Sequence, residues 1–467
     1  MFTELPEEFK NRMRLQLGAG YSAFVQSFEQ PPVRAFSLNT AAISVEHFEE
    51  CAAVRSELRY ERIPGMSHSY YYDPELHIGR CSCHHAGMIY SQDPAAMLVV
   101  EGLSLPKNAR VLDLCAAPGG KSVQLAQKLA DTGGMLISNE PDKSRNSILC
   151  SNIERMGFKN VAVTCMYPDE LAKIYPAYFD AILVDAPCSG EGMFRKYPES
   201  VEQWSIANIN NCAIRQKDIL SSAVSMLKPG GKLVYSTCTY APEEDEEIAD
   251  HICDILGLES ADAPEIVTGY AVAVPLNSGT AYRFYPHISK GEGQFMAYFR
   301  KPGELSENVF SDNLRSVGNK KKADRECIRL VEETFNGLPD IDTERIFKYG
   351  DVLYFIDRRI ERLPEKNVTK AGVCIGSMEK KRFIPHHDFF SAFGGSIKNR
   401  LELSPESSEL SAYLHGEELR LSQVQNGIYS GYDKGFGAVT VLGVPVGGFK
   451  LAGGRIKNHY PKGLRNL

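Results

Sequence analysis

The stretch "ARVLDLCAAPGGKSVQLAQKLA" (residues 109–130) decides the fold, because it joins an apolar strand to a helix through a tight glycine turn. The strand has almost no polar positions, and Gly119 and Gly120 follow it directly. Strands that read as continuous apolar runs are buried on both faces, which is typical of parallel sheets covered by helices. The stretch therefore predicts the first unit of an α/β domain.

The same alternation continues downstream. "GMLISNE" (134–140), "NVAVTC" (160–165), "FDAILVDAP" (179–187) and "GGKLVYSTC" (230–238) are further apolar strands, and helical segments separate them. This order predicts an α/β fold with a doubly wound parallel sheet. Such sheets bind ligands beyond the carboxyl ends of their strands, so the residues there carry the functional information.

Length and composition set outer limits. The chain has 467 residues, which is too long for one core and favours two to four domains. A net charge of -7 gives no overall sign of nucleic-acid binding, so any RNA surface has to be a local basic patch. There is no apolar run of membrane-spanning length, and "MFTELPEEFKNRMR" lacks a signal-peptide core. We expect a cytoplasmic protein without a membrane partner.

The flanking regions differ from the central one. Residues 1–100 predict a small α+β module, with helices at 5–18 and 44–59, the second opened by Ser44, and a strand at 34–40. After residue 302 the alternation stops, and we expect a linker and intermediate region over 303–378 in which Lys320 to Lys322 are solvated.

The C-terminal region 379–467 ends in Gly-rich β-hairpin sequence and a basic tail. The tail supplies the best candidate nucleic-acid patch of an otherwise acidic chain, formed by Arg455, Lys457, His459, Tyr460, Lys462 and Arg465. A solvated C-terminus explains the same composition, and the sequence alone leaves both readings open.

Two clusters of polar residues resemble metal sites, but each has a simpler structural interpretation. "CSCHH" (81–85) offers thiols and imidazoles, but the paired-ligand spacing of structural zinc sites is not repeated elsewhere. The acidic run "PEEDEEIADHICDILG" (242–257) reads as a helix start with Pro242 at its first position. We therefore predict no metal. The twelve cysteines, without a secretion signal, indicate reduced thiols.

The glycine turn allows two interpretations. Gly120, Lys121 and Ser122 resemble a P-loop, and "AILVDA" (181–186) resembles the strand that holds magnesium in nucleotide triphosphatases. Cys115 occupies the position of the first P-loop glycine, however, and Pro118 lacks an N–H donor. Glu140, twenty residues after Gly120, suits a ribose diol. The turn therefore favours an adenosine cofactor that carries a carboxylate, such as S-adenosylmethionine.

Two strand ends carry a cysteine. "DAPCS" places Cys188 just after Asp185, and "STCTY" places Cys238 at the end of the next strand. In the commonest strand order these ends are neighbours, so we expect the thiols to lie side by side. A thiolate that adds to C6 of a pyrimidine makes C5 nucleophilic. Either cysteine alone reads as a small buried apolar residue. We also expect the glycines of "SGEG" (189–192) to let a target base approach closely.

Four motifs in order, "DLCAAPGGKS", "NEPDKSR", "DAPCSGEG" and "STCTY", carry a family resemblance. Together with "QDPAAM", "GEGQFMAYFRK" and "RIKNHYPKGLR", they make the chain similar to the Sun-type (Nol/Nop/Sun) RNA cytosine-5 methyltransferases, close to the RsmF/YebU-like ribosomal RNA branch. The resemblance implies a Rossmann-like methyltransferase domain over 101–302, an RRM-like N-terminal module and a PUA-like C-terminal domain. It also implies RNA as partner, most of all 16S ribosomal RNA or the small ribosomal subunit, and a monomer.

The resemblance also implies roles for single residues. Cys238 adds to C6, Cys188 assists product release, and Asp185 bonds the base near N3. S-adenosyl-L-methionine is held by Glu140, by Arg145, by Asp185 and by the loop Cys115, Ala116, Ala117, Pro118, Gly119, Gly120 and Lys121. Tyr167 stands where the family has an aspartate that contacts the adenosyl part, with Asp169 as an alternative. Transfer RNA as substrate, a P-loop ATPase and a non-catalytic RNA-binding protein remain the alternatives.

Overall fold

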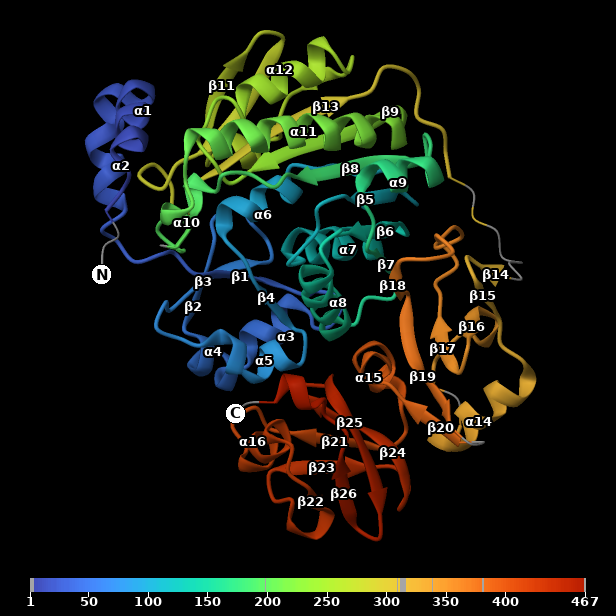
Figure 1. The fold of residues 1–467 in the computed structure, drawn as a ribbon. Helices are drawn as coiled ribbons and strands as arrows, with labels where there is room; N and C mark the ends of the chain where they lie inside the picture. The colour runs from blue at the N-terminus through green and yellow to red at the C-terminus, as the bar shows by residue number, and fades with distance from the viewer. Residues whose placement is uncertain are drawn as a thin grey trace.

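The computed structural model describes residues 4–465 except 198, 309, 311–315, 338, 380 and 381. The strands of these residues form four sheets, which belong to four regions of the chain (Figure 1). A ten-stranded central sheet is flanked by a four-stranded N-terminal sheet, and two six-stranded sheets follow in the C-terminal third. The domain boundaries given above remain predictions.

The central sheet has the predicted doubly wound topology. Its parallel strands lie in the order β7-β6-β5-β8-β9, where β5 is Arg110–Asp113, β6 is Met135–Asn139, β7 is Val161–Thr164, β8 is Phe179–Asp185 and β9 is Leu227–Thr237. Beyond β9 the sheet continues antiparallel with β13 (Gln294–Arg300), β12 (Gly279–Phe284) and β11 (Val272–Leu276), and β10 (Glu259–Ala261) also pairs with β13. The strand order reverses between β5 and β8, the place where such sheets bind ligands.

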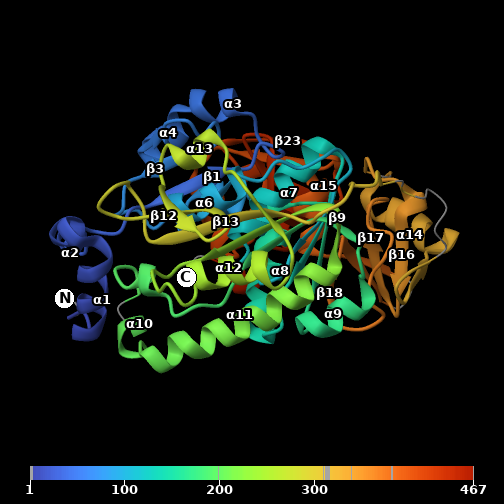
Figure 2. The same cartoon turned by 90° about the horizontal axis from the view of Figure 1, so that it is seen from above.

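Helices cover both faces of the central sheet (Figures 1 and 2). One face packs against α6 (Pro94–Glu101), α7 (Gly120–Thr132), α8 (Lys143–Met156) and α13 (Glu265–Thr268). The other packs against α9 (Pro168–Ile174), α11 (Ile206–Met226) and α12 (Glu246–Asp254). Alternate strand residues face the two layers, so Leu112 and Val111 lie in different cores. None of the helices in the described residues has both the length and the apolar character needed to cross a bilayer.

The acidic run was predicted incorrectly in one respect. Helix α12 begins at Glu246 rather than at Pro242, because residues 242–245 form a turn. Glu244 and Asp245 are fully buried there. These two carboxylates are therefore buried inside the protein and do not lie on an exposed first turn of the helix.

The N-terminal module has the strand order of an RRM. Its sheet is β2-β3-β1-β4, antiparallel throughout, with β1 Ala35–Leu38, β2 Tyr60–Arg62, β3 Ser69–Tyr72 and β4 Ile89–Ser91. Helices α1 (Glu7–Leu17) and α2 (Tyr21–Ser27) precede it, and α1 ends at Gly18 as predicted. The helix expected from Ser44 breaks at Cys51, which is extended, into α3 (Val45–Glu50) and α4 (Ala52–Leu58); α5 (Ser82–His85) follows β3.

The predicted linker is wrong from Ser316 onward. Helix α14 (Arg325–Phe335) and the six-stranded sheet β14-β15-β16-β17-β19-β20 begin in this region, and the sheet extends past the predicted end of the region at residue 378. Its strands are Ser316–Val317, Lys320–Lys322, Ile346–Tyr349, Val352–Phe355, Val373–Glu379 and Arg382–Pro385. Lys320 is buried, with its ammonium over the rings of Tyr349 and Tyr354, and is not solvated as predicted. Strand β18 (Val368–Ala371) pairs with β7, so this region adds an edge strand to the central sheet.

The C-terminal region forms the second six-stranded sheet, consistent with the predicted PUA-like β-rich domain. The order is β22-β26-β25-β24-β21-β23, with strands Leu419–Arg420, Arg455–Asn458, Val444–Ala452, Gly435–Val441, Arg400–Leu403 and Gly427–Ser430. Helices α15 (His387–Phe393) and α16 (Ser408–His415) accompany it. In the predicted basic patch Arg455, Lys457, His459 and Lys462 are exposed and Arg465 is half-buried, but Tyr460 is buried.

Tyr460 connects the C-terminal region to the N-terminal module, so its ring is not exposed for contact with RNA. Its hydroxyl lies 2.7 Å from Nδ1 of His85, and both residues are buried between the N-terminal module and the C-terminal sheet. Apolar residues of both regions share one core there, including Cys81 and Cys83 of the "CSCHH" segment. Within the described residues no His, Cys, Asp or Glu group of three or more has an arrangement that could hold a metal ion.

We expect Tyr460→Phe to loosen this junction, because the change removes one buried hydrogen bond, a loss of about 1 kcal/mol. Hydrogen–deuterium exchange should become faster in β4 and β26. The matched control is Tyr429→Phe, whose exposed hydroxyl donates to the Tyr432 carbonyl, and it should leave exchange in these strands unchanged. Unaltered exchange in Tyr460→Phe would show that the junction does not depend on this bond.

Candidate active site

The carboxyl ends of the parallel strands open onto a cleft of about 1400 Å³. Every residue for which a cofactor or catalytic role was predicted lines this cleft, with the exceptions of Gly119 and of Asp169, the alternative to Tyr167. Gly119 lies behind it and makes the turn into α7 at a φ of 116°, a conformation that favours glycine. The cleft therefore gathers Cys115, Ala116, Ala117, Pro118, Gly120, Lys121, Glu140, Arg145, Tyr167, Asp185, Cys188 and Cys238.

The turn between β5 and α7 differs from a P-loop in the use of its polar side chains. Ser122 is fully buried, and its hydroxyl donates to Oδ2 of Asp113 at 2.7 Å and lies 2.8 Å from the hydroxyl of Ser138. In a P-loop this hydroxyl binds magnesium. Because Ser122 is engaged inside the sheet, the geometry argues against the nucleotide triphosphatase interpretation.

Glu140 and Arg145 form a second polar group in the cleft. Glu140 is almost fully buried, with Oε1 accepting from the Asp142 amide at 3.0 Å and Oε2 lying 3.1 Å from the Arg145 guanidinium. Arg145 also donates to the carbonyl of Ala117 at 2.9 Å. The guanidinium thus ties the acid after β6 to the loop after β5, which fixes both against each other.

Tyr167 lies at the rim of the cleft, where 65% of its surface is exposed. It precedes the first residue of α9. The alternative residue, Asp169, is absent from the cleft lining given by the described residues, and its carboxylate pairs with Lys173 at 3.4 Å. Of the two, only the tyrosine is placed to contact a ligand.

The unsatisfied polar atoms of the cleft fit S-adenosylmethionine. Oδ1 of Asp113 and Oε1 of Gln92 are buried in the cleft wall and have no hydrogen-bond partner among the described residues. Burial raises the pKa of Asp113 to about 7. A zwitterionic ligand with an ammonium group, a carboxylate and a ribose diol matches these free acceptors, the helix N-terminus at Gly120 and the carboxylate of Glu140.

Asp185 is held by three donors at the end of β8. Lys121 Nζ lies 2.7 Å from Oδ2, while Ser236 Oγ and Gln294 Nε2 donate to Oδ1 at 2.6 Å and 3.4 Å. The donors come from α7, β9 and β13, so three elements fix one carboxylate. The lysine had been predicted only as part of the cofactor loop, and its contact shows that it also belongs to the Asp185 group.

The two cysteines meet as predicted. Sγ of Cys188 lies 3.2 Å from Sγ of Cys238. The strands that carry them are neighbours, with Asp185 of β8 opposite Ser236 of β9. The contact with Cys238, together with burial, raises the pKa of Cys188 well above that of a free thiol. Cys188 therefore keeps its proton at neutral pH.

Several residues of the cleft were not assigned from the sequence. Lys196 lies at the edge of the cleft with Nζ 3.3 Å from Oδ2 of Asp93, and Arg195 behind it forms a buried pair with Glu292 at 2.9 Å. Asp93 belongs to "QDPAAM" and Glu292 to "GEGQFMAYFRK". Both motifs belong to the family resemblance, and this is the sequence signal that points to Asp93 and Glu292. The spacing of the motifs alone assigns no role to either residue.

Gly192 corrects the expectation for "SGEG". Its amide donates to the carbonyl of Cys238 at 2.9 Å, and a Cβ at this position would lie 2.7 Å from the carbonyl oxygen of Gly293. The glycine therefore lets two segments of this chain approach each other, rather than a target base. Gly190, two residues earlier, has open space around it and a φ of 75°.

The doubly wound sheet and the ligand cleft at its switch point define a Rossmann-like methyltransferase, here combined with an RRM-like module and a PUA-like domain. Three family models agree with this description. "16S rRNA methyltransferase RsmB/F" matches residues 100–300, the "N-terminal domain of 16S rRNA methyltransferase RsmF" matches 5–94, and the "Methyltransferase RsmF PUA domain" matches 398–466.

Relatives that match almost the whole chain belong to the same family as the three models. The chain is 30% identical to the ribosomal RNA small subunit methyltransferase F of Enterobacter sp., over 98% of this chain and 95% of the relative. It is 29% identical to the protein of the same name from Vibrio campbellii, over 98% and 97%. The chain belongs to the RsmF family of 16S ribosomal RNA methyltransferases.

Solved structures share the central part of the fold. A methyltransferase homolog protein from Pyrococcus horikoshii is 26% identical, with a TM-score of 0.53 over 63% of this chain and 100% of its own. NSun6 from Pyrococcus horikoshii, determined with SFG, is 21% identical, with a TM-score of 0.58 over 65% and 100%. At this identity the second likeness concerns the fold alone.

We expect Gly192→Ala to disturb the approach of the two cysteine segments, since its Cβ meets backbone atoms that have no room to move. Overpacking of this kind costs about 1–3 kcal/mol. The melting temperature should fall, and methyl transfer to ribosomal RNA should fall by more than about tenfold.

Gly190→Ala is the matched control. It costs about 1 kcal/mol because alanine disfavours a positive φ, but it meets no neighbouring atom and should keep methyl transfer. Equal losses of methyl transfer in both variants would contradict the role assigned to Gly192.

Proposed function

We propose that the protein is an S-adenosylmethionine-dependent RNA cytosine-5 methyltransferase that acts on 16S ribosomal RNA through a covalent adduct between Cys238 and C6 of the target base. The observation that carries the proposal is the pair of thiols 3.2 Å apart at adjacent strand ends, next to the fixed carboxylate of Asp185. Methylation of an exocyclic amine needs no thiol, whereas C5 of a pyrimidine becomes nucleophilic only after a nucleophile has added to C6.

The cofactor is proposed to bind between the loop 115–121 and Glu140. The helix N-terminus at Gly120 suits its carboxylate, Asp113 and Gln92 offer acceptors to its ammonium group, and Glu140 suits the ribose hydroxyls. Tyr167 at the rim is proposed to face the adenine. When bound, S-adenosylmethionine supplies an electrophilic methyl group.

The residues of this chain are proposed to activate the base as follows. The Cys238 thiolate adds to C6, and Asp185, positioned by Lys121 and Ser236, bonds the base near N3 where charge develops. C5 is then nucleophilic. After C5 has been methylated and has lost its proton, the bond between C6 and Cys238 breaks.

Cys188 is proposed to assist that last step. Its raised pKa keeps the thiol protonated, and its sulfur lies 3.2 Å from the sulfur that leaves C6. A proton shared from Cys188 stabilises the departing thiolate of Cys238. This division of roles is the one that the family resemblance implies for the two motifs that carry Cys238 and Cys188.

The substrate class follows from the family, whose relatives are named as small-subunit methyltransferases. The RRM-like and PUA-like parts suit RNA contacts outside the cleft. Since the proposed substrate is ribosomal RNA, we expect the protein to work in the cytoplasm. The monomeric state remains a prediction.

We expect Cys238→Ala to abolish methyl transfer and adduct formation, and Cys188→Ala to leave adduct formation intact while the protein stays bound to RNA. Denaturing gels with labelled 16S RNA and cofactor separate the two outcomes. Cys51→Ala, in the N-terminal module, is the control and should turn over normally. An adduct with Cys238→Ala but none with Cys188→Ala would exchange the two roles.

Titration calorimetry should detect binding of S-adenosylmethionine and none of ATP. Glu140→Ala is expected to weaken cofactor binding by about tenfold or more, since a buried acceptor for the ribose is lost. Glu170→Ala on α9 is the control, because this exposed carboxylate does not line the cleft. Binding of ATP without S-adenosylmethionine would overturn the cofactor assignment.

A further inference from the structure

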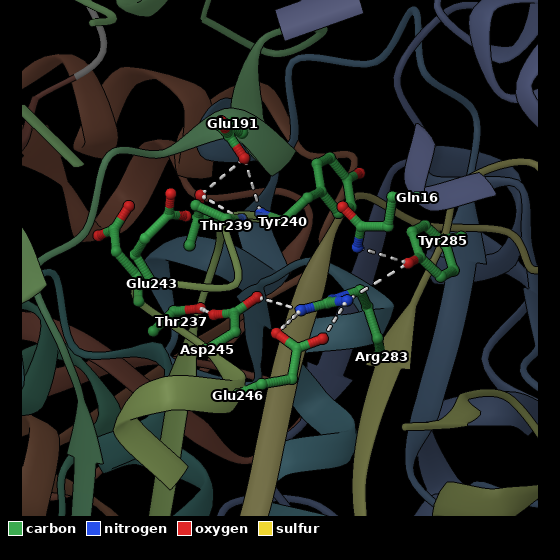
Figure 3. Close-up of polar contacts among 12 residues, drawn as sticks. Gln16, Glu191, Thr237, Thr239, Tyr240, Glu243, Asp245, Glu246, Arg283 and Tyr285 are labelled. Atoms are coloured by element: carbon green, nitrogen blue, oxygen red, sulfur yellow. Dashed lines mark hydrogen bonds and ion pairs between the residues drawn. The ribbon is translucent and has the colours of Figure 1, made fainter. Parts of the chain in front are cut away.

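Cys238 lies between two threonines, and each threonine donates its hydroxyl proton to a buried carboxylate (Figure 3). Thr237 donates to Oδ1 of Asp245 at 2.5 Å, and Thr239 donates to Oε2 of Glu191 at 3.0 Å. Both carboxylates are almost fully buried and neither lines the cleft. They therefore act on the cysteine through the backbone on its two sides.

The contact of Thr237 fixes the end of β9 to the start of α12. Asp245 is fully buried and pairs with the buried guanidinium of Arg283 at 2.7 Å. Arg283 in turn makes a bidentate contact with Glu246, at 3.0 Å and 2.7 Å (Figure 3). Two carboxylates share one guanidinium here, so Asp245 is held on this side of the cysteine by a hydroxyl and by a buried cation.

The contact of Thr239 connects the two cysteine segments. Glu191 lies three residues after Cys188, yet it accepts from Thr239 Oγ1 and from the Tyr240 amide, both at 3.0 Å, in the segment that follows Cys238. Its second oxygen accepts from Trp204 Nε1 at 2.8 Å. One carboxylate thus binds the loop after β8 to the loop after β9.

A chain of hydroxyls reinforces this connection. The hydroxyls of Ser189 and Thr239, the residues next to the two cysteines, lie 2.8 Å apart. Because Thr239 gives its proton to Glu191, the proton between the hydroxyls must come from Ser189. The Ser189 amide donates to Glu244 at 3.0 Å, and Gln216 bridges Glu244 and the Pro187 carbonyl.

We infer that Ser189, Thr239 and Glu191 are positioning residues that set the spacing of the two thiols, so that Cys188 reaches the sulfur of Cys238 as it leaves the product. This inference rests on the proposed function for its consequence, but the spacing itself is a property of the folded protein. A buried network of hydrogen bonds holds one geometry more firmly than apolar packing does. The proposed sharing of a proton between Cys188 and the sulfur of Cys238, which lie 3.2 Å apart, depends on that geometry.

The spacing can be measured without RNA, through the tendency of the two thiols to form a disulfide. Full-length protein is equilibrated with mixtures of reduced and oxidised glutathione, quenched with acid, and analysed by mass spectrometry for the peptide pair Cys188–Cys238. Two thiols pass two electrons and two protons to one oxidised glutathione, which yields one disulfide and two reduced glutathiones. The equilibrium gives the effective concentration of one thiol at the other.

Thr239→Val and Ser189→Ala each remove one hydroxyl of the chain, and the first keeps the size of the side chain while the second shortens it by one atom. We expect each to lower the effective concentration by about tenfold, the effect of one lost buried hydrogen bond. Thr239→Ser restores the hydroxyl and should match the parent protein. Thr440→Val is the second control, because Thr440 is a buried threonine that donates to a glutamate, Glu402, in the C-terminal sheet.

The second readout is the adduct with RNA during turnover. Thr239→Val and Ser189→Ala should accumulate the adduct as Cys188→Ala does, although both cysteines are present. An unchanged effective concentration in both variants overturns the inference, whatever the adduct does. A lowered effective concentration without adduct accumulation supports the positioning role and contradicts the release role proposed for Cys188, so the two failures are distinguishable.

Discussion

The register between β8 and β9 is the constraint on which the site depends. Asp185 lies opposite Ser236. A shift of one strand by one residue would turn its side chains to the other face of the sheet and separate the cysteines that follow. At the other end of the pair, where the register shifts between Phe179 and Ala181, a buried contact anchors the beginnings of the two strands. Asp180 of β8 pairs with Lys228 of β9 at 2.8 Å and accepts from the Arg110 amide of β5 at 2.6 Å. Since breaking a buried ion pair leaves an uncompensated charge, slippage is strongly disfavoured. Parallel pairing therefore brings the thiols to the same edge, and an ion pair remote from the cleft helps to keep them there.

The carboxylates beneath the site have a different task from those that face the cleft. Glu191, Glu244 and Asp245 are buried and bonded to backbone amides, hydroxyls or Arg283, and they hold the segments that carry the cysteines. Burial of a carboxylate is expensive unless it is hydrogen-bonded, so each of them specifies the position of its partners. Helix α1 adds to this arrangement, because Arg12 makes a bidentate pair with Glu243 in the turn before α12. The N-terminal segment thus braces the same turn from outside the central sheet.

Local patterns were sufficient for the central sheet and for the gathering of the cleft residues. The strands β5 to β9 are continuous apolar runs, and the common strand order then placed Cys188 beside Cys238. Residues whose partners lie far away in the sequence could not be predicted in this way. Tyr460 looked like an aromatic in a basic tail, yet it is buried against His85, and Lys320 looked solvated, yet its aliphatic chain and ammonium pack on tyrosines of two later strands. The acidic run failed for the same reason, because composition does not show that Arg283, on β12, neutralises Asp245. Tertiary contacts decided each of these cases.

Apolar interfaces connect the outer regions to one another and to the central sheet, since Ile63 of the N-terminal module lies in the core on one face of that sheet and Phe347 of β16 lies in the core on the other. The N-terminal module and the C-terminal sheet share one hydrophobic core, α14 and α15 share another with β24, and β18 adds an edge strand next to β7. Domains joined by small polar contacts move relative to each other, whereas large apolar interfaces hold them in place. The basic side chains Arg455 and Lys457 on β26 therefore keep a fixed spacing from the cleft that holds Cys238. In the proposed function, a cytosine inside folded RNA leaves its stack before it reaches Cys238, which costs a few kcal/mol. Rigidly spaced basic side chains then offset this cost, because the binding energy is not spent on ordering the protein itself.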